Sequence, residues 1–153
     1  MTEYLNKFAV PLFWAVVAYL KPIGNELSVL CLIFATNFFC GLITDIIVNN
    51  ASFRFRKAWQ CIKELVVFLA LIVLVYQYGN LKSWQGGAMQ IVSFVTYTVT
   101  YFYTINSLRN MKLLFKEKTA AHKVFSFLHF ALSLEIVKWI PYLDEYLNKH
   151  EEK

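Results

Sequence analysis

The sequence predicts an all-α integral membrane protein with three to four transmembrane helices and a C-terminal amphipathic helix at the membrane interface. Three observations predict this class: the composition, the length of the charge-free intervals and the distribution of basic residues. Hydrophobic residues make up 58% of the 153 residues and aromatic residues 18%, against only 16% charged residues. This balance lies outside the range of soluble domains. No repeat or long linker divides the chain, so we expect one membrane domain over residues 1–153.

The first apolar interval is the shortest. It runs from Phe8 to Leu20, and its 13 uncharged residues span about 20 Å as a helix. Since the hydrocarbon core is about 30 Å thick, a crossing over approximately residues 8–24 requires Lys7 and Lys21 to reach outward. A position in the membrane interface is the alternative. A cleaved signal peptide is disfavoured because no small-residue cleavage pattern follows the apolar run.

Three further segments are long enough to cross a bilayer, at residues 27–48, 65–81 and 88–108. The charge-free intervals on which they rest are residues 27–44, 65–81 and 83–108, which have 18, 17 and 26 residues. The second of the three includes the run VVFLALIVLV, which has no polar side chain and is typical of a helix that faces lipid. Gly86 and Gly87 predict the loop that precedes the last segment.

The positions of lysine and arginine predict the orientation. Basic residues are concentrated in the loop at 49–64 and in the stretch at 109–123, whereas the loop between the third and fourth segments has only Lys82. Both basic stretches should lie in the cytoplasm, which places the tail at 109–153 inside. The N-terminus lies inside if the first segment spans and outside if it is interfacial. The basic residues expected at the membrane surface are Arg54, Arg56, Lys57, Lys63, Arg109, Lys112, Lys116, Lys118 and Lys123.

Two patterns near these charges also indicate the membrane surface. The apolar run at 124–134 is too short to span and is bounded by charges, so an interfacial helix is expected there. Phe53, Phe55 and Trp59 alternate with basic residues, which in a soluble domain would indicate single-stranded nucleic acid. Beside two membrane segments the pattern is typical of an interface belt, so the predicted partner is lipid and no nucleic acid is expected.

Polar residues recur on one face of the fourth predicted helix. They are Gln90, Ser93, Tyr97, Thr100, Thr104 and Ser107, alternately three and four positions apart. Asn37, Gly41 and Thr44 form a companion face on the second helix. Such residues mark places where membrane helices pack closely and hydrogen-bond. Packing within one chain is the commoner role, and a self-association face that becomes wet, as a pore wall does, is the alternative.

No catalytic arrangement is visible in the sequence. The three histidines, His122, His129 and His150, all lie in the tail, and the chain has no HExxH, GxSxG or phosphate-binding glycine loop. The three cysteines lack the spacing of a zinc site or a disulfide framework. We therefore expect no catalytic residue, no metal ligand and no cofactor, and a protein that is not an enzyme.

The stretch NFFCGLITDIIVNNASFRFRKAWQCIKELVVFLALIVLVY resembles the core of a phage holin family that includes clostridial toxin-secretion holins. Members of that family have an apolar helix with an acidic residue four positions before a glycine, then a polar loop with serine and basic residues, then a second apolar helix. Gly41 matches the glycine, and Asn37 stands where the acidic residue is usual. The loop is matched by Ser52, Arg56, Lys57 and Lys63. The segment INSLRN is loosely similar to the family's pattern at the end of the last helix, so the resemblance covers roughly residues 27–110.

The resemblance implies a protein that accumulates in the cytoplasmic membrane of an infected bacterium, self-associates and opens a lesion. Its partners would then be the lipid bilayer, further copies of the chain, and an endolysin or other secreted protein that passes through. The alternative from a different class is a non-pore membrane adaptor whose basic C-terminal segment binds a partner protein or anionic lipid. Conductance distinguishes the two.

Overall fold

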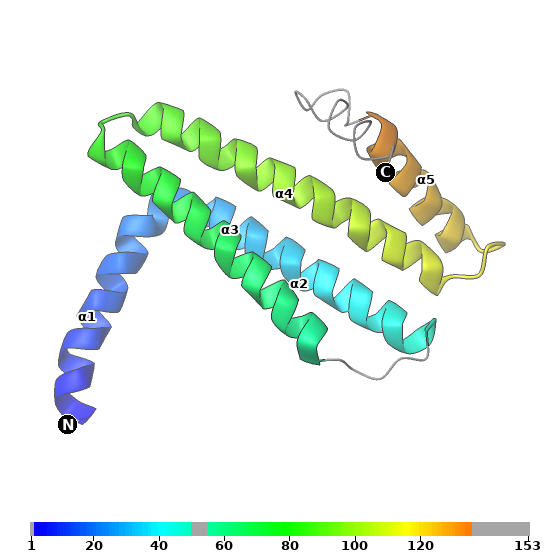
Figure 1. Ribbon diagram of the computed structural model, residues 1–153, viewed down its shortest axis with the longest axis horizontal. Helices are drawn as coiled ribbons and strands as arrows, with labels where there is room; N and C mark the ends of the chain where they lie inside the picture. The colour runs from blue at the N-terminus through cyan, green and yellow to red at the C-terminus, as the bar shows by residue number, and fades with distance from the viewer. Residues whose placement is uncertain (1, 50–54, 136–153) are drawn as a thin grey trace. The chain divides into compact units, whose positions relative to one another are not determined.

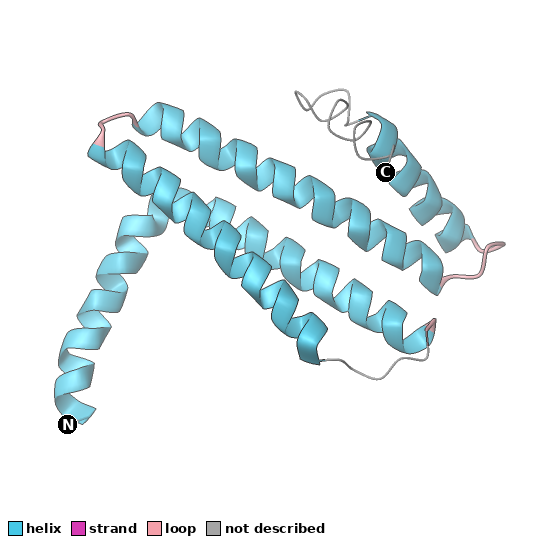
Figure 2. Cartoon of the chain, viewed as in Figure 1, coloured by secondary structure: helices cyan, strands magenta, loops and turns pink. Residues whose placement is uncertain are grey.

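The computed structural model describes residues 2–49 and 55–135, and these residues form helices joined by short turns (Figure 1). The elements are α1 (Thr2–Leu20), the 3₁₀ turn η1 (Lys21–Ile23), α2 (Gly24–Ile47), α3 (Phe55–Leu81), α4 (Gln85–Leu114) and α5 (Ala120–Glu135). Figure 2 shows no strand among the described residues, which confirms the all-α prediction for this part of the chain. Two helical stretches there, Ala9–Ile47 and Ala58–Leu81, are long and apolar enough to cross a membrane.

The turn between α3 and α4 differs from the predicted one. Gly86 and Gly87 lie in the first turn of α4, and the chain reverses at residues 82–84. There Ser83 adopts a φ of 54°, and the Trp84 amide donates a hydrogen bond of 2.9 Å to the Gly79 carbonyl. A Cβ on Gly87 would lie 2.1 Å from the Trp84 ring. This glycine therefore makes room for an aromatic ring rather than marking a loop.

Proline explains the interruption between α1 and α2. Pro22 has no amide hydrogen to donate, and its ring disfavours the α conformation of the residue before it. The chain accordingly forms η1 over Lys21–Ile23, and the Gly24 amide donates to the Lys21 carbonyl before α2 continues. The predicted first segment is thus helical, and it is separated from α2 by a single tight turn rather than by a loop.

Contacts along the chain group the residues into two units, which we describe separately. The first comprises residues 1–32 and 59–100. In this unit α3 and α4 approach each other closely because Gly79 has no side chain. A Cβ there would lie 2.2 Å from the Cβ of Ala88. Tyr19 of α1 contacts α3, where its ring centroid is 5.6 Å from that of Tyr76 and its hydroxyl accepts a 3.1 Å hydrogen bond from the Asn80 amide. The buried residues of this unit are Ile23, Leu30, Ile72, Tyr76, Ala88, Val92, Thr96 and Val99.

The second unit comprises residues 33–58 and 101–153. In it, α2 and α4 pack through Phe34 and Tyr103, whose ring centroids are 4.2 Å apart. Helix α5 packs on α4, because the Tyr101 hydroxyl donates a 3.1 Å hydrogen bond to the Leu132 carbonyl. The hydroxyl of Thr119 caps the start of α5 by accepting from the His122 amide at 3.2 Å.

Candidate functional site

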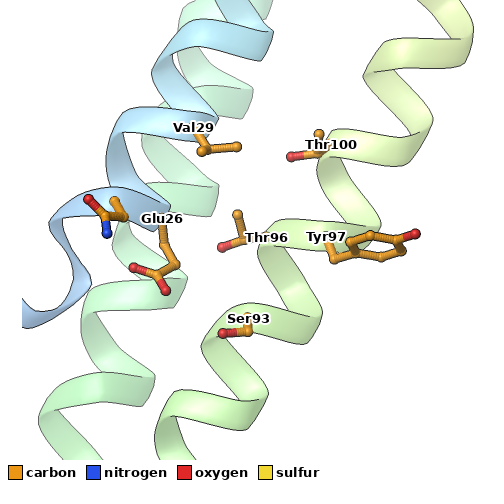
Figure 3. A pocket seen from close by; sticks show the side chains of 7 residues that line it. Glu26, Val29, Ser93, Thr96, Tyr97 and Thr100 are labelled. Atoms are coloured by element: carbon orange, nitrogen blue, oxygen red, sulfur yellow. The ribbon is translucent and has the colours of Figure 1, made fainter.

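An open cavity of about 270 Å³ lies between α2 and α4 in the first unit (Figure 3). Figure 3 shows the Glu26 side chain reaching from α2 into this space, with the side chain of Thr96 opposite it on α4. The hydroxyls of Ser93 and Thr100 point to the same side, whereas the Tyr97 ring points away. The residues that line the cavity are Asn25, Glu26, Val29, Ser93, Thr96, Tyr97 and Thr100.

Helical spacing explains why these groups meet. Ser93, Thr96 and Thr100 are three and four positions apart, which places them on one face of α4. Sequence analysis predicted Ser93, Tyr97 and Thr100 as a polar face but missed both Thr96 and Glu26. Thr96 could have been included, because it is three positions after Ser93 and four before Thr100. Glu26 was not singled out, because it lies just before the predicted segment at 27–48.

Three oxygens at this cavity lack hydrogen-bond partners. They are Oε2 of Glu26, Oγ1 of Thr96 and Oγ1 of Thr100, and each is buried. Thr96 as a whole is only 8% exposed. In contrast, the hydroxyl of Thr98, elsewhere on α4, donates a 2.8 Å hydrogen bond to the Phe94 carbonyl of its own helix. Because a buried polar group without a partner costs about 1–3 kcal/mol, the three oxygens favour a ligand, water or a second chain in the cavity.

A second polar contact joins α2 and α4 in the second unit. The Asn106 amide donates a 2.5 Å hydrogen bond to Oδ1 of Asn37, and the Arg109 guanidinium donates at 2.7 Å to Oδ1 of Asn106. Asn37 was predicted to make an inter-helix contact, and within this chain it makes one with α4.

Thr44 and Gly41 lie next to this contact. Thr44 is 4% exposed, and its hydroxyl lies 2.8 Å from the Cys40 carbonyl and 3.1 Å from the Asn110 carbonyl. A Cβ on Gly41 would lie 3.6 Å from the Asn110 amide nitrogen, which is ordinary contact distance. The predicted face of α2 thus packs against α4 of the same chain. Alanine has room at Gly41.

The predicted stripe on α4 is not uniform. Gln90, Ser93 and Tyr97 are exposed, and Thr104 is half-buried. Ser107 is 6% exposed, and its hydroxyl donates to the carbonyl of Tyr103 one turn earlier. The two ends of the stripe therefore have different surroundings: one is open, and the other is packed.

The basic residues after the stripe lie near the end of α4, in the turn that follows it and in the first turn of α5. Arg109, Lys116, Lys118 and Lys123 are exposed, as is Lys63 on α3, and Lys112 is half-buried. Burial lowers the pKa of His129 on α5 below its usual 6.5, and the positive charges of Lys112 and Arg109 lower it further. Nδ1 of His122 lies 2.9 Å from the Lys112 carbonyl, which can only accept, so this nitrogen carries the hydrogen.

Some predicted residues fall outside this description. Arg54 and His150 lie outside the described residues. Arg56 and Lys57 lie in the first turn of α3, but only their backbone is described.

Comparison with protein families, with curated proteins and with solved structures gives no match to this chain.

Proposed function

We propose that this protein is a holin-like membrane protein that self-associates in the bacterial cytoplasmic membrane and permeabilises it. The observation that carries the proposal is the cavity at Glu26, Thr96 and Thr100, whose unpartnered oxygens face an open space. Lipid tails offer no hydrogen bonds. Water, an ion or a second copy of the chain can meet these oxygens, and a water-filled assembly provides both water and further copies.

The exposed apolar surface supports the membrane setting. Only 11% of the most apolar part of Ala58–Leu81 is buried, and Val67 and Leu74 are 62% and 67% exposed. On α1, Phe13 and Trp14 are similarly exposed. Lipid solvates exposed apolar side chains of this kind, whereas water does so only at a cost. We infer three to four crossings, with α4 as a crossing whose polar face is turned away from lipid.

The tail fits the same proposal. Exposed apolar residues recur along α5 at positions typical of one helical face, and exposed lysines flank its start. A helix of this kind lies in the headgroup region of an anionic membrane. We place it on the cytoplasmic side, with the C-terminus. The exposed large apolar residues are Val124, Phe127, Leu128, Phe130 and Leu134.

Membrane potential in growing bacteria tests the proposal. Assembly depends steeply on concentration, so induced expression should depolarise the cells after a delay and then abruptly, and co-expressed endolysin should lyse them. Leucine at Ser93, Thr100 and Thr104 should delay or abolish the collapse without removing the protein from the membrane, because subunits lose hydroxyl contacts. Thr98→Leu is the matched control, since that hydroxyl bonds within its own helix. Sustained potential at high membrane levels of the unmodified protein would refute the holin function.

The second candidate is a non-pore adaptor, favoured by the exposed Lys116, Lys118 and Lys123 next to the apolar face of α5. An adaptor would leave the potential unchanged at any expression level. Glutamine at the three lysines should then abolish its binding to anionic vesicles or to a partner, whereas a pore would keep depolarising the membrane.

A further inference from the structure

We propose that the cavity between α2 and α4 is a binding site for one monovalent alkali cation, such as sodium. The site consists of the Glu26 carboxylate and the hydroxyls of Ser93, Thr96 and Thr100. Binding requires no pore, so it stands or falls separately from the proposed function.

The donor set selects a hard cation. Every polar group that Figure 3 shows turned toward Glu26 offers an oxygen, and oxygen ligands suit alkali and alkaline-earth ions rather than softer metals. Buried Oγ1 atoms of Thr96 and Thr100 have no partner and point into the space that Glu26 enters. A cation there would satisfy all three unpartnered oxygens at once.

The charge and the size of the cavity select a monovalent ion. Of the seven lining residues only Glu26 is charged, so the site supplies a single negative charge and no basic side chain competes for it. A divalent ion would leave one positive charge uncompensated in apolar surroundings, where an unpaired charge is expensive. The volume of about 270 Å³ exceeds that of one water molecule several-fold, which leaves room for an ion that keeps part of its hydration shell.

Purified full-length protein in detergent micelles provides the test. Binding of radiolabelled sodium and the thermal unfolding midpoint would be measured near neutral pH, with N-methylglucamine chloride replacing sodium chloride at constant ionic strength. We expect one bound ion per chain and a midpoint that rises with sodium. Glu26→Gln should abolish both. Glu64→Gln should change neither, because that carboxylate lies on α3 and accepts from Gln60 at 3.1 Å.

A second variant keeps the test decisive if Glu26→Gln fails to fold. Thr96→Val retains the carboxylate and the shape of the side chain, and it should weaken sodium binding about tenfold, the cost of one hydrogen bond or ligand to a charged group. Thr98→Val should not weaken it. Absence of sodium binding would overturn the proposal, as would binding that survives Glu26→Gln in a folded protein. Displacement of sodium by an equal concentration of magnesium would overturn the monovalent assignment.

Discussion

The hydrogen bond between Asn37 and Asn106 gives the sharpest test of helix packing in this chain. Leucine at Asn37 keeps the branching of the side chain but removes the acceptor of the 2.5 Å bond, which leaves the Asn106 amide without this partner. Polar contacts between membrane helices contribute about 0.6 kcal/mol on average and up to about 1.7. An unsatisfied amide adds about 1 kcal/mol. We therefore expect Asn37→Leu to lower the free energy of unfolding by about 1–2 kcal/mol.

The double variant separates the contact from its surroundings. With leucine at both Asn37 and Asn106 no amide is left unpartnered between the helices, so the double substitution should cost about 1 kcal/mol less than the sum of the two single ones. Reversible unfolding by sodium dodecyl sulfate in mixed micelles, followed by far-ultraviolet circular dichroism, measures all four proteins. Arg109→Gln is the control, because Arg109 is exposed and its bond to Asn106 should contribute little. Additivity within about 0.3 kcal/mol would refute the contact.

Three further predictions follow from other contacts. Gly79→Ala should destabilise the α3–α4 hairpin by about 1–3 kcal/mol, because its Cβ would collide with the facing helix. Gly86→Ala should stabilise the protein slightly, because a Cβ there would have nothing within 4 Å. The thermal unfolding midpoints of the two variants test this difference. The pKa of His129 is lowered in the folded protein, so the unfolded chain binds more protons between that lowered pKa and 6.5. As the pH falls through this window, α5 should lose protection from hydrogen exchange. His129→Gln should remove this pH dependence. A cysteine at Lys82 should react with an impermeant reagent on intact cells, and reaction of one at Lys116 instead would show that the orientation is inverted.

The helices were predictable because their signals are local. Long charge-free intervals and the proline after Lys21 depend only on neighbouring residues, and α2, α3 and α4 lie where those intervals predicted helices. The ends were less predictable. Helix α3 begins at Phe55, ten residues before the predicted span, because a charged sequence such as RKAWQCIKE forms a helix as readily as an apolar one. Charged residues indicate where the membrane-spanning part of a helix ends, but not where the helix itself ends.

The candidate site was predicted only in part, because the spacing of residues within one helix does not show which residues of another helix face it. The hydroxyl face of α4 follows from its period, but nothing in the sequence shows that Glu26 faces it. The partnership of Asn37 with Asn106 was likewise not deducible, since 69 positions separate them. In both cases the missing information was the rotation of α2 about its own axis, which is decided by the packing of apolar residues such as Leu30 and Phe34.

The two ends of the α4 stripe allow assembly to be distinguished from folding. Leucine at Ser107 must disturb the packing around a side chain that is 6% exposed, so it should lower stability whether or not the protein assembles. Leucine at Gln90 and Tyr97, which are exposed, removes polar groups without entering the core of its own chain. If the stripe is an assembly face, this second variant should unfold at the same detergent concentration as the unmodified protein and yet give fewer cross-linked oligomers in membranes. Equal loss of oligomers and of stability in both variants would instead show that the whole stripe serves packing within one chain.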